Sequence, residues 1–220
     1  MAFTLYYHPL SSFCHKVLVA LYENDIAFEG RIIDLGAAKD RAELGALWPF
    51  CKFPVLGDSE RQRNLPESSI IIEYLDQFAA VQHRLIPVDF NDALQVRLWD
   101  RIFDTYVHKP MQDIVLDHIL GGKGDMTATR ATIQTAYAMI DQHLAASPWA
   151  AGQAFSMADC AAAPALFYAH IVEAFPEQHV HLRAYFDKLM DRPSVQRVLA
   201  EAKPYFPMYP FRSAIPARFL

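Results

Sequence analysis

The stretch Phe3–Glu23 constrains the fold more than any other part of the chain. Its first five residues, Phe3–Tyr7, are β-prone and apolar, and the Pro9 that soon follows cannot donate to a strand ladder. Ser11 and Ser12 then offer hydroxyls that favour the start of a helix. Apolar side chains recur after them at helical spacing: Cys14, Val17, Leu18, Leu21 and Tyr22. The pattern predicts a strand, a short turn and a helix whose N-terminus, flanked by serines and a cysteine, favours an anion.

Composition excludes several classes of protein. The chain has 220 residues, of which 53% are hydrophobic and 20% charged, so it can bury a sizeable core. A net charge of −5, without a run of Lys and Arg, argues against nucleic acid or an anionic membrane as a partner. Three widely spaced cysteines form neither a disulfide framework nor a zinc signature. We expect a cytoplasmic protein, because no signal peptide is evident and Cys160–Tyr168, the most apolar window, is too short to span a bilayer.

The first 80 residues alternate between strand and helix patterns. A second strand is predicted within Ala27–Leu35, a short helix or irregular segment within Lys39–Trp48, and two short strands at residues 54–57 and 62–65. Pro66 then stands where a helix favours proline, at its first position, with an acidic residue next to it. The order β-α-β-α-β-β-α predicts an α/β thioredoxin-like domain over residues 1–80.

The rest of the chain reads as all-helical. A linker is predicted at residues 81–88, followed by an all-α C-terminal domain over residues 89–220 with an extended tail. Helices are expected at Ala93–His108 and Gln112–Leu120, interrupted near Pro110, and at Thr127–Ala146, Leu182–Met190 and Val195–Ala202. The tail from Lys203 onward is rich in proline and aromatic residues, so we expect it to lie against the body of the protein.

A further helix start is marked by Ser156-Met157-Ala158-Asp159. Serine followed by a carboxylate three residues later is the pattern of a capping box. In it, the serine side chain accepts from the backbone N–H of the acidic residue, and the carboxylate accepts from the backbone N–H of the serine. The pattern predicts a buried helix that begins after Ser156.

Three N-terminal motifs together resemble a known family. Ser11-x-x-Cys14 resembles the redox motif of the thioredoxin fold with its first cysteine replaced by serine. Lys52-Phe53-Pro54-Val55-Leu56 and Leu65-Pro66-Glu67-Ser68-Ser69-Ile70 follow it. In this order the motifs resemble the N-terminal domain of the cytosolic glutathione S-transferase superfamily, in a serine-type, bacterial-like form. The capping box, preceded by a turn that contains Gly152, is similar to one in the helical domain of that family.

The resemblance implies that glutathione is a co-substrate and that a serine hydroxyl stabilises its thiolate. Ser11 matches the family's catalytic position, and Ser12 is the alternative because a shift of one residue in the turn would exchange them. Two interpretations of Cys14 are possible: a reactive thiol, or a small buried apolar residue. Cysteine-type members of the family carry their reactive cysteine at the position of Ser11, which favours the second interpretation.

The same resemblance assigns glutathione-binding residues beyond Ser12. The bond between Phe53 and Pro54 is expected to be cis, which would aim the backbone of Phe53 at the cysteinyl part of glutathione. Lys52 would meet the glycine carboxylate. Glu67 would accept from the γ-glutamyl ammonium, and Ser68 would hold the carboxylate at a helix N-terminus. Phe53 and Cys51 depart from the residues usual in the family.

The second substrate is expected to be a small, apolar electrophile. Candidate lining residues are Leu10, Phe13, Arg101, Tyr106 and His108. Aromatic residues at helical spacing also suit a core, and solvated or packed roles for the histidines remain open. No metal-ligand spacing is present, so no metal is expected, and the family resemblance implies a homodimer.

The sequence is also compatible with two other functions. A glutathione-dependent isomerase of maleyl-type compounds would keep the same site, although that group usually has two serines followed by cysteine, where this chain has Phe13. A non-enzymatic binding or interaction protein could use the same scaffold, although Pro54, Glu67 and Ser68 are all retained.

Overall fold

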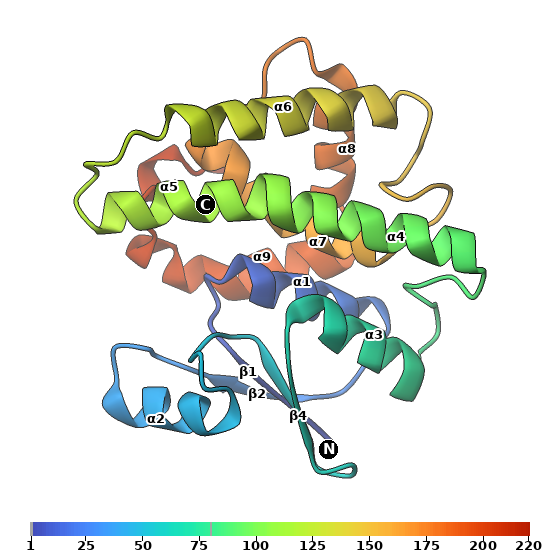
Figure 1. Cartoon of the computed structure of the whole chain (residues 1–220), viewed down its shortest axis with the longest axis vertical. Coiled ribbons are helices and arrows are strands. Elements are labelled where there is room, and N and C mark those ends of the chain that lie inside the picture. The colour runs from blue at the N-terminus through green and yellow to red at the C-terminus, as the bar shows by residue number, and fades with distance from the viewer. Residues whose placement is uncertain (1, 80) are drawn as a thin grey trace. The chain divides into compact units, whose positions relative to one another are not determined.

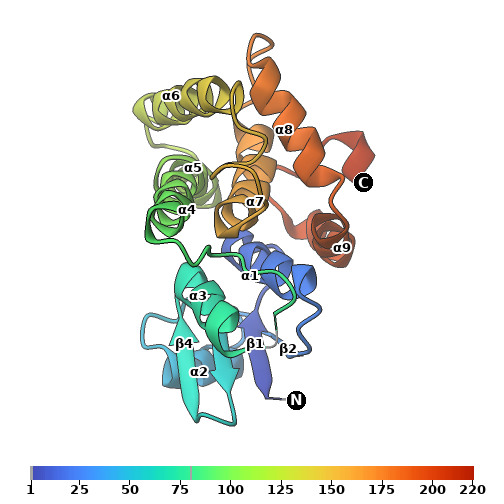
Figure 2. The same ribbon diagram turned by 90° about the vertical axis from the view of Figure 1, so that its right-hand side faces the viewer.

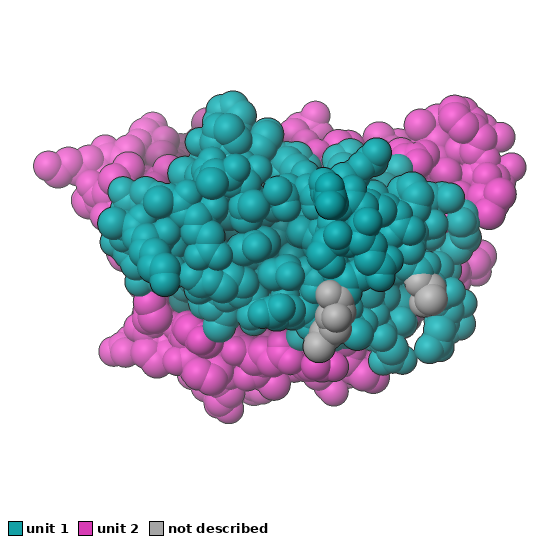
Figure 3. All heavy atoms as spheres, turned by 90° about the horizontal axis from the view of Figure 1, so that it is seen from below, with its two compact units in different colours: residues 1–85 teal, residues 86–220 magenta. Residues whose placement is uncertain are grey.

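Residues Phe3–Tyr7 form strand β1, which lies inside a four-stranded sheet of order β2-β1-β3-β4. The computed structural model describes residues 2–79 and 81–220. Strand β2 (Glu29–Ile32) runs parallel to β1, whereas β3 (Val55–Asp58) runs antiparallel to it and β4 (Arg63–Pro66) antiparallel to β3. The sheet belongs to the first of two compact units, residues 1–85, and residues 86–220 form the second (Figure 3).

The two faces of the sheet are covered by different helices (Figure 1). Helices α1 (Ser12–Glu23) and α3 (Ser68–Phe78) pack side by side on one face, and α2 (Ala38–Leu47) lies on the other. Side chains of a strand alternate between faces. Tyr6 and Val55, paired across β1 and β3, pack with Leu44 of α2, which places Leu5 and Leu56 on the opposite face. The mixed sheet with helices on both faces confirms the predicted thioredoxin-like domain.

The second unit is built around one buried helix (Figure 2). Helix α7 (Met157–Val172) buries every residue except His170 and packs against α4 (Phe90–Phe103), α5 (Lys109–Ile119) and α8 (Val180–Met190). Helix α6 (Thr127–Leu144) packs on α5 and α8, and α9 (Pro193–Ala202) packs on α8. The all-helical C-terminal domain is thereby confirmed. Among the described residues, no helix is long and apolar enough to cross a membrane.

The predicted capping box is present at the start of α7. The Asp159 carboxylate accepts from the backbone N–H of Ser156 at 2.9 Å and from its hydroxyl at 3.0 Å. The same carboxylate accepts from the Ala150 N–H at 2.9 Å and the Tyr185 hydroxyl at 2.6 Å. Asp159 therefore joins three segments of the second unit, and it is fully buried.

The tail lies against its own unit, as expected from its aromatic content. Short 3₁₀ turns form at Lys203–Met208, Arg212–Ala214 and Ala217–Phe219. The Phe206 ring stacks on Phe167 of α7 with centroids 6.2 Å apart, and Phe219 meets Phe167 edge-on at 5.2 Å. Tyr209 meets Tyr168 at 5.3 Å. Residues near the end of the chain thus complete the aromatic core around α7.

Two prolines behave differently from the sequence prediction. Pro66 does not begin a helix but ends β4, where it pairs with Val55, and α3 starts two residues later. Pro110 does not interrupt the helices, because the five residues Asp104–His108 form a π-helical turn that joins α4 to α5. In this wider turn the Lys109 N–H donates to the Asp104 carbonyl, so the chain passes Pro110 without a break.

Candidate active site

Three chain segments converge at one edge of the sheet because of strand register. Tyr6 pairs with Val55, and Val55 pairs with Pro66. The end of β1, the start of β3 and the end of β4 therefore lie next to each other. The turn Pro9–Ser12, the segment Lys52–Pro54 and the dipeptide Glu67-Ser68 extend from these three points. These three segments carry the residues that the sequence assigned to glutathione.

Ser11 forms the N-cap of α1. Its backbone is extended and its hydroxyl oxygen accepts from the Cys14 N–H at 3.3 Å. Its own N–H donates to the His8 carbonyl at 3.0 Å. Ser11 is half-buried, whereas Ser12 is only 3% exposed. Of the two serines, Ser11 is therefore the more accessible to a ligand.

Cys14 lies inside the first turn of α1 and is fully buried. Burial raises the pKa of its thiol to about 12, although hydrogen bonding with Ser11 and the backbone of His8 offsets part of this rise. A thiol with such a pKa is protonated at neutral pH and is a poor nucleophile. The structure therefore favours the buried, unreactive interpretation of Cys14.

The bond between Phe53 and Pro54 is cis, as predicted. The Phe53 ring stacks on the imidazole of His8, with centroids 5.9 Å apart and planes 19° from parallel. This contact joins the segment before β3 to the segment after β1. Burial lowers the pKa of His8, and its Nδ1 accepts from the Leu10 N–H at 3.2 Å. Lys52 is exposed.

Glu67 and Ser68 turn the chain from β4 into α3. Glu67 has a φ of 70°, in the left-handed region that few non-glycine residues adopt. The N-terminus of α3 has no side-chain cap and no acidic residue in its first turn. Ser68 is buried and Glu67 exposed. Helix N–H groups and the positive end of the helix dipole thus remain for an external anion.

Sequence reasoning missed one residue beneath this edge. Lys16 of α1 is fully buried and donates from Nζ to the Ser69 hydroxyl at 2.8 Å. No local pattern indicates this contact, because Ser69 lies 53 residues further along the chain.

The predicted second-substrate residues lie in both units. Leu10 and Phe13, in the first unit, are half-buried. In the second unit, Arg101 forms ion pairs with Asp100 and Asp104. His108 is fully buried with Nδ1 at 3.2 Å from the Asp104 carboxylate, and Tyr106 is exposed.

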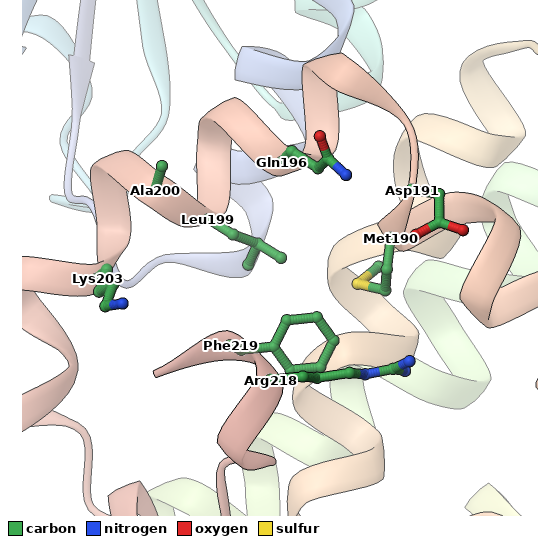
Figure 4. Close-up of a pocket in the computed structure, with 8 residues that line it drawn as sticks. All are labelled: Met190, Asp191, Gln196, Leu199, Ala200, Lys203, Arg218 and Phe219. Atoms are coloured by element: carbon green, nitrogen blue, oxygen red, sulfur yellow. The ribbon is translucent and has the colours of Figure 1, made fainter.

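A separate pocket of about 350 Å³ lies within the second unit (Figure 4). Its wall includes the Phe219 ring, which the figure shows beside the Arg218 side chain, and its other lining residues come from the end of α8, from α9 and from Lys203. None of the residues assigned from sequence lines it. The Arg218 guanidinium is already paired with Asp187 at 2.7 Å. The pocket is therefore distinct from the edge of the sheet described above.

Two family models match the chain. A model of the glutathione S-transferase N-terminal domain matches residues 5–83, and a model of the C-terminal domain of the same family matches residues 124–188. The first match contains the strand edge and its three segments, and the second contains the capping box and most of α7 and α8.

Individual proteins agree with these matches. A glutathione S-transferase of Silene vulgaris is 29% identical over 218 residues, covering 92% of this chain and 99% of the relative. A delta-class glutathione transferase of Nilaparvata lugens has a similar structure, with a TM-score of 0.84 at 22% identity, covering 96% of this chain and 99% of that chain. A glutathione S-transferase of Methylobacillus flagellatus, solved with glutathione bound, has a TM-score of 0.75 at 24% identity and covers 89% and 98%.

Proposed function

The chain belongs to the glutathione S-transferase superfamily, and from this membership we propose that it is an enzyme that conjugates glutathione to a small, apolar electrophile. The observation that carries the proposal is a pair of helix N-termini at one edge of the sheet. Each begins with serines, and neither has an acidic residue in its first turn. Such ends attract anions, and glutathione carries a thiolate and carboxylates at separate positions.

In the proposed mechanism, Ser11 donates its hydroxyl proton in a hydrogen bond to the glutathione sulfur. A bond to the charged form favours that form, so the pKa of the bound thiol falls and the thiolate is present at neutral pH. The dipole of α1 acts in the same direction. The sulfur then attacks an electrophilic carbon, and the leaving group departs with the displaced electron pair.

The remaining contacts orient the tripeptide. Ser68 would hold the γ-glutamyl carboxylate at the start of α3, and Glu67 would accept from its ammonium. The Phe53 backbone, turned by the cis bond before Pro54, would pair with the cysteinyl residue, and the exposed Lys52 would meet the glycine carboxylate. Binding at several points fixes the sulfur beside the second substrate and supplies proximity.

The test compares the wild type with Ser11→Ala and Ser12→Ala, using glutathione and an aryl halide, with glutathione binding measured by calorimetry. We expect Ser11→Ala to lower kcat by about 10²-fold with binding retained, the loss typical of removing one donor to a developing or stabilised anion. Ser12→Ala should keep most of the activity. Equal rates for Ser11→Ala and wild type would remove Ser11 from the mechanism.

The wild type itself separates the other functions. Tight glutathione binding without conjugation of any aryl halide would favour the isomerase, which is then assayed with a maleyl compound. Absence of glutathione binding would contradict a catalytic role and leave an interaction protein.

We also propose that two copies of the chain associate. Phe90, Leu94 and Leu98 recur every four residues on α4 and are 72%, 49% and 49% exposed. Large apolar side chains in such a row are typical of a surface that another protein covers. A second copy of the chain is the partner that the family membership favours.

A further inference from the structure

The buried ammonium of Lys16 has no role in the proposed mechanism so far. It lies on α1 among apolar neighbours in sequence, including the buried residues Val17 and Leu18. A lysine is almost never fully buried without partners, because removal of its charge from water is costly. An apolar residue such as methionine would fill the same space without that cost.

One acceptor of Lys16 is the second residue of α3. Its Nζ donates to the Ser69 hydroxyl at 2.8 Å, and Ser69 directly follows Ser68. The first turn of α3 has no side-chain cap and enters from the left-handed backbone of Glu67. The contact from α1 therefore helps to fix a turn whose own capping is incomplete.

The same contact joins the two halves of the proposed glutathione site. Lys16 belongs to the helix that Ser11 caps, and Ser69 belongs to the helix that carries Ser68. Ser11 would contact the sulfur and Ser68 the γ-glutamyl carboxylate of one ligand. A rigid link between α1 and α3 sets the distance between these two anchors, and so determines whether one tripeptide reaches both.

We propose that Lys16 is a positioning residue that holds the first turn of α3 in place for the γ-glutamyl end of glutathione. This inference rests on the proposed function. It predicts that loss of the contact weakens glutathione binding in the ground state and in the transition state alike. Such a change raises KM and leaves kcat nearly unchanged.

The test uses Lys16→Met, which keeps the length of the side chain and removes the charge, and Ser69→Ala, which removes the acceptor. We expect the Kd and KM for glutathione to rise about tenfold in each, as for loss of one hydrogen bond to a charged group, with kcat within about twofold of wild type. Lys16→Arg should recover part of the affinity. Lys123→Met, on an exposed loop, is the control and should match the wild type.

Double variants locate the effect along the ligand. Combined with Ser68→Ala, Lys16→Met should add little further loss, because both act on the γ-glutamyl end. Combined with Lys52→Ala, at the proposed glycine end, the two losses should multiply. The inference is overturned if both single variants keep the wild-type Kd while only their melting temperature falls, or if kcat falls instead of affinity. A wild type that does not bind glutathione would instead contradict the proposed function itself.

Discussion

Replacement of Asp159 by alanine should destabilise the second unit far more than loss of an ordinary helix cap. The substitution removes the carboxylate half of the capping box at the start of α7, a loss of about 1 kcal/mol. It also leaves two buried donors, the Ala150 N–H and the Tyr185 hydroxyl, without this acceptor. Each such donor costs about 1–2 kcal/mol, so the free energy of unfolding should fall by about 3–5 kcal/mol. That loss is a large part of the stability of a typical domain.

Urea unfolding followed by far-ultraviolet circular dichroism measures this loss. The matched control is Asp89→Ala, because Asp89 also caps a helix, accepting from the N–H groups of Asn91 and Asp92, but it is exposed. The control should lose only about 1 kcal/mol. Equal losses for Asp159→Ala and Asp89→Ala would refute the reasoning, since burial of the donors would then carry no cost. The loss of unfolding free energy in Tyr185→Phe should lie between the losses in Asp89→Ala and Asp159→Ala.

Three shorter predictions concern other residues. Burial lowers the pKa of His8 below 6.5, so at acidic pH the unfolded chain binds a proton more readily than the folded chain does. The free energy of unfolding should therefore be unaffected by His8 above pH 6.5 and should decline as the pH falls below it. Urea midpoints measured against pH should show this slope, and His8→Phe should reduce it. Charge placed on the α4 row in Leu94→Glu with Leu98→Glu should shift the mass measured by light scattering from dimer to monomer, and a dimer that persists would exclude this surface. Iodoacetamide at pH 8 should label the half-buried Cys51 before Cys14, because a pKa of about 12 keeps the buried Cys14 thiol protonated. Mass spectrometry that shows Cys14 labelled first would contradict its burial.

Local sequence signals were sufficient where neighbouring residues determine the structure. The turn from β1 into α1 follows from Pro9 and the cap Ser11, and the start of α7 follows from Ser156 and Asp159. In each case the side chain that ends or begins the element bonds to a backbone group within four residues. The cis bond before Pro54 was instead predicted from family resemblance, because its local sequence suits a trans bond equally well.

The failed predictions involve long-range pairing and helix geometry. Pro66 suits a helix start by itself, but its pairing with Val55 on the neighbouring strand keeps it in the sheet. Pro110 suits a helix boundary because it has no N–H to donate, yet the π-helical turn before it keeps α4 and α5 continuous. The contact between Lys16 and Ser69 could not be predicted, because the two residues lie 53 positions apart in the chain. Sequence patterns record none of these distant partners.

The aromatic tail has a consequence for synthesis of the protein. Residues of the first unit find their compact partners before residue 86, so that unit can fold while the helical unit is still being translated. Helix α7 is different, because two of the ring contacts of Phe167 come from Phe206 and Phe219. Those rings emerge from the ribosome 39 and 52 residues later, after a delay of several seconds at about 5–20 residues per second. The central helix of the second unit therefore lacks part of its aromatic core until Phe219 has been synthesised.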